Sequence, residues 1–463
     1  MRFTLIAILI FLSSIAGKAQ QVPQDRTFQF NLQECLEYAY RNNDSLKNAQ
    51  LDIESAKYKV KETFGIGLPQ VSGSASFQDF IKVPTTLLPD FISPSVYGVL
   101  EKEKLVPEDK TRAFGFIPAQ FGTKYQSSAG LTLNQLIFSG SYLVGLQASK
   151  TFKELSERLF NRTKNTTTIN VTKAYYQVLV SGEQMRLLNA NVSQLEKQLK
   201  ETTELNKQGF VEKIDLDRLR VIYNNLLTNR ENTERLLVLS TQLLKFQIGM
   251  PVTERLDVKD KISDIKLDPS ASISVDTTAY RNRIEYSLLE TQRKLNDLNV
   301  KRLKSEYLPT LAAFGSTTKQ FQANEFRDLY DQSFPTTVVG LQLNVPIFSG
   351  FQKKYQIKQA QIEVRKNDNI LNTAKNGFLL QQEQSRITFF NGLKSLNNQK
   401  ANMELAKEVL RVSSIKYKEG VGSSIEVTQA QTELETAENN YIQALYNALV
   451  SKVDLDNAYG RIQ

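Results

Sequence analysis

Two acidic residues in matching positions are the first candidates for chemistry in this chain. The 463 residues contain no histidine and one cysteine, so a reactive or ion-binding site must be built from carboxylates and hydroxyls. Asp215 lies six residues after Gly209 (215 − 209 = 6), and Glu426 lies six residues after Gly420 (426 − 420 = 6). Both acids lie where a helix is predicted to begin. A purely structural role in the first helical turn, favoured by the helix dipole, therefore stays open beside a functional one.

The composition excludes several classes of function. Without histidine there are no His-based zinc sites and no His-containing triads, and one cysteine forms no disulfide framework. The chain has no phosphate-binding loop and no nucleophile motif, so we predict no enzyme, no catalytic residue, no metal and no cofactor. The formal net charge is +9, but lysines and arginines are interleaved with acids. The sequence lacks the basic stripe that nucleic-acid binding needs.

Residues 1–19 are predicted to be a signal peptide. Arg2 is the basic start, an apolar run follows from Leu5 to Leu12, and Gly17 and Ala19 provide small residues for cleavage. The alternative is a membrane-anchoring helix, for which this apolar run is short. Cys35 lies beyond the cleavage region, and we expect it to pack within a helix.

The elements that position the two acids are repeated. The run Leu131 to Gly140 and the run Leu341 to Gly350 both alternate apolar with polar residues and both end in Ile-Phe-Ser-Gly. A long polar stretch of helical composition follows each of them. We therefore predict that a β-strand passes directly into a long α-helix at Phe138 and Gly140, and in an equivalent way at Phe348 and Gly350.

The repeat divides the chain into two units of similar order. The first unit, 20–251, has a helix, strands near 70–80 and 125–138, and a helical hairpin that turns near 207–213. An irregular connector, 252–277, leads to the second unit, 278–463, with a helix, strands near 310–321 and 335–348, and a turn near 418–424. Prolines, aromatics and charges between the first two strands predict an irregular loop within 78–124.

The predicted elements do not complete a fold within one chain. Four strands are too few to close a barrel, and their open edges do not tolerate lipid. Three chains would supply twelve strands. From Gly140 to Gly209 the chain advances 69 residues (209 − 140 = 69), which spans about 100 Å as one helix. That length suits a tube or a projecting coiled coil rather than a globular domain.

These features together resemble the TolC-like outer-membrane efflux proteins. The resemblance covers nearly the whole mature chain and rests on its Leu32-to-Asn43 segment, the Leu-Pro before each first strand, both Ile-Phe-Ser-Gly junctions and both glycine-marked turns. It implies an α+β membrane protein: a homotrimeric twelve-stranded barrel, four strands per chain, continuous with a long α-helical coiled-coil tunnel. It also implies a place in the outer membrane of a Gram-negative-type cell, contact with its lipid, and a tunnel in the periplasm. The implied partners are a periplasmic adaptor protein and an inner-membrane transporter.

The same resemblance assigns roles to individual residues. Family members close their tunnel near the paired helix turns, and Glu426, Gln429 and Asp215 correspond to the constriction there. A ring of three Glu426 side chains would favour cations, while Gln429 stands where members carry a second acid. Gly209, Gly420 and Gly422 correspond to the turns where an adaptor would dock, although glycine is also the usual turn former. Phe138, Gly140, Phe348 and Gly350 correspond to the barrel-to-tunnel passage.

The resemblance implies a passive, tip-gated exit duct of a tripartite efflux pump or a type I secretion system. The alternative is a secreted coiled-coil structural or adhesin protein. That alternative explains the long helices but not the paired alternating strands or the duplication. The sequence does not identify the cargo.

Overall fold

The computed structural model describes residues 27–262, 265, 267 and 277–462. The predicted signal peptide, 1–19, and part of the predicted connector, 252–277, lie outside the described residues. The described chain forms two compact units. The helical unit contains residues up to Ala56, Thr151–Lys294 and Val364 onward, and the sheet unit contains Lys57–Lys150 and Leu295–Glu363. Each unit takes residues from both halves of the predicted repeat.

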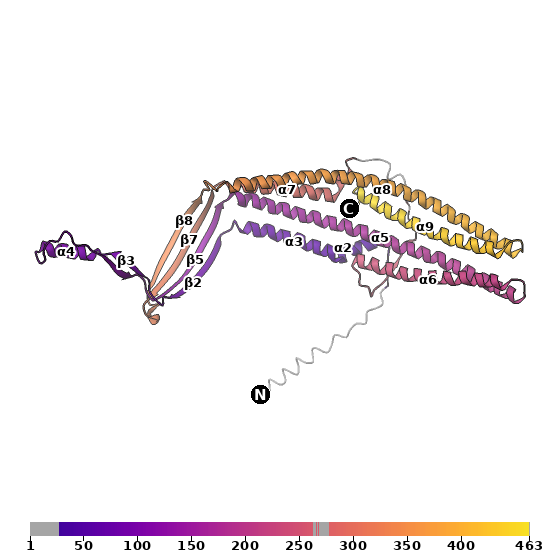
Figure 1. Ribbon diagram of the computed structural model, residues 1–463, viewed down its shortest axis with the longest axis horizontal. Helices are drawn as coiled ribbons and strands as arrows, with labels where there is room; N and C mark the ends of the chain where they lie inside the picture. The colour runs from indigo at the N-terminus through magenta and orange to yellow at the C-terminus, as the bar shows by residue number, and fades with distance from the viewer. Residues whose placement is uncertain (1–26, 263–264, 266, 268–276, 463) are drawn as a thin grey trace, which may run out of the picture. The chain divides into compact units, whose positions relative to one another are not determined.

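The sheet unit contains four antiparallel strands in the order β2-β5-β7-β8 (Figure 1). They are β2 (Gln70–Asp79), β5 (Tyr125–Phe138), β7 (Thr310–Ala323) and β8 (Ser333–Asn344). Three of them cover the residues predicted as strands. The fourth ends at Asn344, four residues before the predicted end at Phe348 (348 − 344 = 4).

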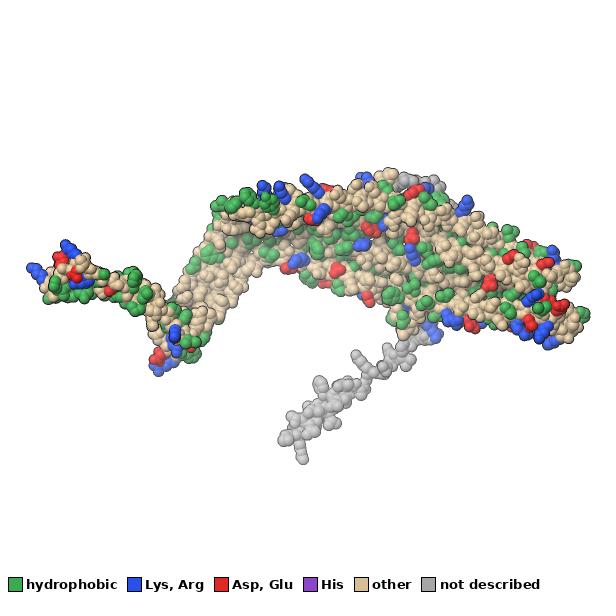
Figure 2. All heavy atoms as spheres, viewed as in Figure 1, with side chains coloured by type: hydrophobic (Ala, Val, Ile, Leu, Met, Phe, Trp, Pro, Cys, Tyr) green, Lys and Arg blue, Asp and Glu red, His purple; other side chains and the backbone are tan. Residues whose placement is uncertain are grey.

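The two faces of this sheet differ in chemistry because alternate side chains point to opposite sides. Val71 pairs with Leu133, and Gly315 pairs with Val339, which places apolar residues of three strands on one face. The other face carries hydroxyls, and Ser76 and Ser128 share a hydrogen bond of 2.8 Å across two strands. In the view of Figure 2 the sheet surface is mainly tan, the colour of backbone and uncharged polar side chains.

The segment 78–124 is not the irregular loop that the sequence predicted. It holds a second small sheet of β3 (Thr85–Pro89) with β4 (Phe116–Gln120), and a helix, α4 (Ile92–Lys102). Arg112 lies 2.8 Å from Glu101 and stacks over the ring of Tyr97. Pro89 and Pro118 lie in the ribbon, where each strand has a free edge that tolerates proline. Pro94 lies in the first turn of α4, where its missing N–H would have no helical partner.

The helical unit is built from long helices, four of which also contribute residues to the sheet unit. The helices are α2 (Leu32–Asn42), α3 (Asp44–Gly65), α5 (Gly140–Lys207), α6 (Lys213–Ile248), α7 (Ile284–Ser305), α8 (Gln352–Lys418) and α9 (Ser424–Ala458). The sequence predicted a single helix before the first strand of the first unit, but Asn43 separates α2 from α3 with an extended backbone. Among the described helices, none is both long enough and apolar enough to cross a bilayer.

Helices α5 and α6 form the first hairpin, and α8 and α9 form the second (Figure 1). In the first hairpin Leu188, Val192 and Leu195 are buried against Leu219 and Leu226, and they form a seam between α5 and α6. The second hairpin has a matching core, made of Met403, Leu410, Val427, Ala430 and Leu434. Burying one such leucine contributes about 1.5–3 kcal/mol, so packing along these seams stabilises helices of this length.

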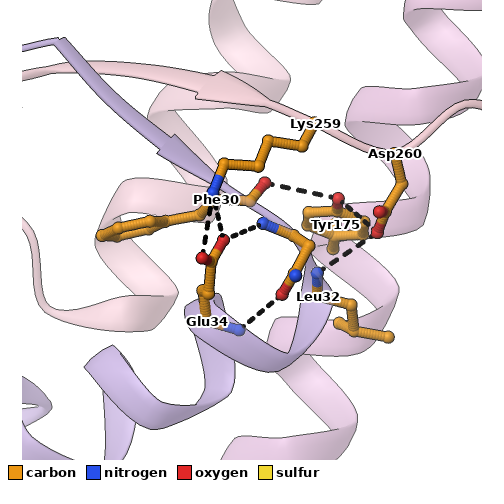
Figure 3. A network of polar contacts seen from close by, with 7 residues as sticks. Phe30, Leu32, Glu34, Tyr175, Lys259 and Asp260 are labelled. Atoms are coloured by element: carbon orange, nitrogen blue, oxygen red, sulfur yellow. Dashed lines mark hydrogen bonds and ion pairs between the residues drawn. The ribbon is translucent and has the colours of Figure 1, made fainter.

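A parallel strand pair that the sequence did not reveal fixes the start of the described chain. β1 (Thr27–Phe30) pairs with β6 (Arg255–Val258), in the predicted connector. Figure 3 shows the polar network beside it, in which the Tyr175 hydroxyl donates to Asp260 at 2.8 Å and Lys259 lies 2.9 Å from Glu34. Glu34 also forms a capping box with Asn31 at the start of α2. The Asn31 N–H, and then Lys259, lower the pKa of the Glu34 carboxyl.

Candidate functional site: the two helix turns

The first helix turn ends α5 at Lys207 and begins α6 at Lys213. Gly209 has φ +81°, the left-handed conformation that favours glycine, and no atom lies within 4 Å of where its Cβ would be. The Phe210 N–H donates to the Leu205 carbonyl at 2.9 Å, which closes the helix end. The Phe210 side chain is 76% exposed at the apex.

The second helix turn repeats this geometry between Lys418 and Ser424. Gly420 has φ +74°, and the Val421 N–H donates to the Lys416 carbonyl at 3.0 Å. Val421 is 78% exposed, the counterpart of Phe210. Gly422 is close-packed, because a Cβ there would lie 2.9 Å from the Lys416 Cβ. Gly209 and Gly420 are thus favoured by their left-handed backbone, whereas Gly422 is favoured because a side chain there would collide with Lys416.

Asp215 ties the two hairpins together. It lies in the first turn of α6, and its carboxylate accepts a hydrogen bond from the Ser424 hydroxyl at the first position of α9. Arg218 on the same helix lies 3.4 Å away. The Asp215 side chain is largely shielded, and it lines a small cleft between the hairpins together with Thr202 and Tyr417. Burial, and then the charge of Asp215, raise the pKa of the Tyr417 hydroxyl.

Glu426 and Gln429 have a different setting from Asp215. Both are exposed on α9, and the Glu426 N–H donates to the Ser423 hydroxyl at 3.3 Å. The Gln429 side chain donates to Glu433 on its own helix at 3.0 Å. Within one chain, therefore, Asp215 is brought to the start of α9, while the side chains of Glu426 and Gln429 remain free to face solvent or a neighbouring chain. In Figure 2, side chains of both signs of charge lie near the ends of the hairpins.

Two further contacts between the hairpins were missed by sequence reasoning. Asn191 on α5 donates to the Glu438 carboxylate on α9 at 2.5 Å, and Asn229 on α6 donates to Glu435 at 2.6 Å. Glu438 is only 6% exposed. A signal for it was present, because Glu438 follows Val427, Ala430 and Leu434 at helical spacings and so occupies an apolar position of the α9 seam.

The two strand-to-helix junctions are not equivalent, contrary to the prediction. At the first, β5 ends at Phe138 and α5 begins at Gly140, next to buried Ser139. At the second, β8 ends at Asn344, α8 begins only at Gln352, and Phe348 is 76% exposed between them.

The described residues contain no group of three or more metal-ligating side chains. Cys35 is fully buried, and burial raises the pKa of its thiol to about 12, so it stays a protonated packing residue. The chemistry of the turns is therefore that of hydrogen bonds and exposed charge, without a reactive group.

Comparison with known proteins gives one consistent family. The model of the outer membrane efflux protein family matches residues 281–461. Outer membrane protein TolC of Escherichia coli K12 is 22% identical over 442 residues, which cover 93% of this chain and 82% of that protein. The proteases secretion protein PrtF of Dickeya chrysanthemi is 22% identical over 341 residues, or 72% of each chain.

Solved structures share the fold. CusC superposes with a TM-score of 0.71 at 13% identity, covering 95% of both chains. The Campylobacter jejuni CmeC outer membrane channel superposes with a TM-score of 0.70 at 17% identity, covering 93% of this chain and 85% of that one. The arrangement of one four-stranded sheet and two long helical hairpins is therefore a known one.

Proposed function

This chain belongs to the TolC-like family of outer membrane efflux proteins, and from that premise we propose that three copies form a passive exit duct gated at the helix turns. The relatives support an outer-membrane efflux or secretion channel protein. We further propose that the duct docks to a periplasmic adaptor, which links it to an inner-membrane transporter. The helical tunnel would lie in the periplasm.

The observation that carries the proposal is the incomplete sheet. Among the described residues, β2 and β8 have no strand partner on their outer edges, yet one face of the sheet is apolar. Unpaired backbone groups are not stable in lipid, so these edges need strands from other chains. Three copies give twelve strands, a number sufficient to close a barrel that leaves a wet interior. The hydroxyl-rich face would then line the water-filled side.

Exposed apolar stripes on the helices are a second argument that each chain contacts further subunits. Leu236, Leu239, Leu243 and Phe246 recur at helical spacings on α6, and each is about half exposed or more. A second stripe on α8 contains Leu405, Val409 and Val412. Contiguous apolar patches of this kind mark interaction sites, and neighbouring hairpins of a trimeric tube would cover them.

The tie between Asp215 and Ser424 supports a gate at the turns. It joins the first turn of α6 to the first turn of α9, so the two hairpins separate only when it breaks. A hydrogen bond to a charged group contributes about 1.5–3 kcal/mol. Losing about 1.5 kcal/mol corresponds to roughly a tenfold shift in the ratio of closed to open hairpins.

Docking of an adaptor would use the turn apices. Phe210 and Val421 present exposed apolar side chains directly after Gly209 and Gly420. Each apex is held by the same backbone hydrogen bond, so the two apices offer a partner similar surfaces.

Single-channel recording in planar bilayers tests the proposal. We expect wild-type protein to form ion-conducting pores of low conductance. Ser424→Ala should lower the ratio of closed to open hairpins about tenfold, and the mean conductance should therefore rise. Glu426→Ala should also raise conductance, and it should weaken block by multivalent cations because three negative charges are lost from the proposed ring.

A matched control is Thr436→Ala, which removes an exposed hydroxyl of α9 that bonds only within its own helix in the described chain. It should leave conductance unchanged. Protein that inserts into the bilayer but forms no pores would refute the duct. Pores unaffected by both Ser424→Ala and Glu426→Ala would refute a gate at the turns.

A further inference from the structure

Glu438 is a buried carboxylate in a contact between hairpins. It lies on α9, well inside the helical unit, and is 6% exposed. Its carboxylate accepts from the Asn191 amide of α5 at 2.5 Å, so the contact joins the second hairpin to the first. Removing an ionised carboxylate from water is costly unless a charge or several hydrogen bonds compensate it.

The nearby cations are already engaged elsewhere. Arg186 of α5 faces Glu438 but makes a bidentate pair with Glu183, at 2.7 and 2.8 Å. Lys407 of α8 also faces it but is paired with Glu404 at 3.2 Å. The remaining neighbour, Glu435 of α9, carries a like charge. Glu438 therefore has an uncharged amide as its direct partner and no cation of its own.

Glu438 differs from the other acids in the direction in which its surroundings shift its pKa. Burial is the dominant cause and raises the pKa of the Glu438 carboxyl, while the Asn191 hydrogen bond opposes it. The other described carboxyls whose pKa departs clearly from its usual value are all lowered. Arginine or lysine is the main cause of the lowered pKa at Glu154, Glu383 and Glu408, and nearby hydroxyl and backbone N–H groups are the main cause at Glu34, Asp90 and Asp109. The chain has no histidine to respond to mild acid. A response of the helical unit to mild acid therefore points to Glu438.

We propose that Glu438 and Asn191 form a proton-sensitive clamp that positions the two hairpins against each other, tight when Glu438 is protonated and looser when it is ionised. This proposal deepens, and rests on, the proposed gating by hairpin separation. Glu438 acts as a positioning residue, since it touches the neighbouring hairpin and not the cargo. The clamp lies along the hairpins and is separate from the Asp215–Ser424 tie at the turns.

The direction of the effect follows from linkage. The packed hairpins bind the Glu438 proton more tightly than separated hairpins do, because the pKa is raised in the packed state. The stabilising contribution is complete below the ordinary carboxyl pKa of 4.5 and is lost as pH rises through the raised value. Each unit by which that pKa is raised changes the ratio of packed to separated hairpins about tenfold.

Hydrogen exchange across pH on the full-length protein in detergent tests the clamp. Protection of the backbone near Asn191 and Glu438, corrected for the intrinsic rate, should fall from pH 4.5 to pH 8 in wild type, by about tenfold for each unit by which the Glu438 pKa is raised. Glu438→Gln, which mimics the protonated acid in shape and charge, should remove that pH dependence. Asn191→Asp should steepen it, because two carboxylates then face each other at neutral pH.

Glu433→Gln is the control, since Glu433 is exposed on the same helix and accepts from Gln429. It should keep the wild-type slope. Absence of a slope in wild type, or an unchanged slope in Glu438→Gln, would overturn the clamp. Because exchange is measured without ion flow, conducting pores that lack the slope refute the clamp alone. A normal slope in protein that forms no pores refutes the duct instead.

Discussion

The two helix turns have the same backbone in both halves of the chain, whereas the two strand-to-helix junctions do not. The first turn joins Lys207 to Lys213 and the second joins Lys418 to Ser424, an offset of 211 at both ends (418 − 207 = 211 and 424 − 213 = 211). The two turns share little sequence beyond one glycine. The junctions share Ile-Phe-Ser-Gly and yet differ by several residues of strand.

Three features explain the divergence of the junctions. Pro346 stands where the first copy has Leu136, and proline cannot donate to a strand ladder. β8 is also an edge strand, and it ends at Asn344 opposite Thr310, the first residue of β7. β5 pairs with β2 only as far as Asn134, but it continues along β7 to Phe138 past a bulge. Near the first junction the Gln135 side chain also donates to the Gly67 carbonyl at 2.7 Å, a bond that Val345 cannot make. Neighbouring strands and side chains, rather than the shared Ile-Phe-Ser-Gly motif, therefore determine where each strand ends.

Substitutions at Leu136 and Pro346 test why the two junctions differ, and they have the largest expected effects. Leu136→Pro should destabilise the protein by about 3 kcal/mol, the upper end of the usual range for single substitutions, because Leu136 pairs with Ala312 in the β5–β7 ladder and proline does not fit there. Pro346→Leu should cost little, since β8 is an edge, and should extend β8 toward Phe348. Denaturant unfolding in detergent measures the first effect, and slower hydrogen exchange at Ile347 and Phe348 reveals the second.

Pro346→Ala is the matched control for the second change. It restores the N–H without adding a large side chain, so it should also slow exchange at Ile347. If Leu136→Pro were tolerated as easily as the native Pro346, strand position in the sheet would not explain why the junctions differ.

The two junction glycines offer a smaller test, because they are required for different reasons. A Cβ on Gly140 would lie 2.9 Å from the Leu308 Cδ1 and 3.1 Å from the Ser305 carbonyl oxygen, so Gly140→Ala should cost about 2 kcal/mol through overpacking. Gly350 has open space around it but φ +59°, so Gly350→Ala should cost about 1 kcal/mol through backbone strain.

Second substitutions separate these two causes in the same unfolding assay. Leu308→Ala should partly relieve Gly140→Ala by removing the contacting methyl group. Gly350→Asn should be milder than Gly350→Ala, since asparagine tolerates the left-handed conformation. Equal costs for Gly350→Asn and Gly350→Ala would contradict the role assigned to φ.

Periodicity predicted most of the helices and strands of this fold. The long helices and three of the four strands follow from apolar spacing, because packing along a seam or a sheet face imposes that spacing directly. β1 and β6 were missed because four-residue strands are too short to show a period. The sequence did not predict β3, β4 or α4, because proline usually marks a loop. An edge strand accepts proline, as at Pro89 and Pro118, and so does the first turn of a helix, as at Pro94.

The candidate site was predicted less completely than the fold. Glycine marked both turns because only a left-handed residue closes these helix ends. Spacing from the turns placed Asp215 and Glu426 in first helical turns, but it gave no information on their partners. The Ser424 hydroxyl and the Asn191 amide meet acids far away in the sequence, and such contacts depend on how the two hairpins pack rather than on local pattern.

The smallest expected effect concerns the difference in helix capping between the two turns. Ser423 caps α9 by accepting from the Glu426 N–H at 3.3 Å, whereas Glu212, its counterpart before α6, makes no such bond. Ser423→Ala should therefore cost about 1 kcal/mol, and Glu212→Ala close to nothing.

Introducing the missing cap sharpens the comparison further. Glu212→Ser should slow hydrogen exchange in the first turn of α6, with a gain of at most about 1 kcal/mol, because a serine there can accept an N–H that now lacks a side-chain cap. Exchange in the first turn of α9 should respond to Ser423→Ala and not to Glu212→Ser. If both turns lose protection equally on substitution to alanine, the cap is not what distinguishes them, and the resemblance of their backbones extends to their energetics.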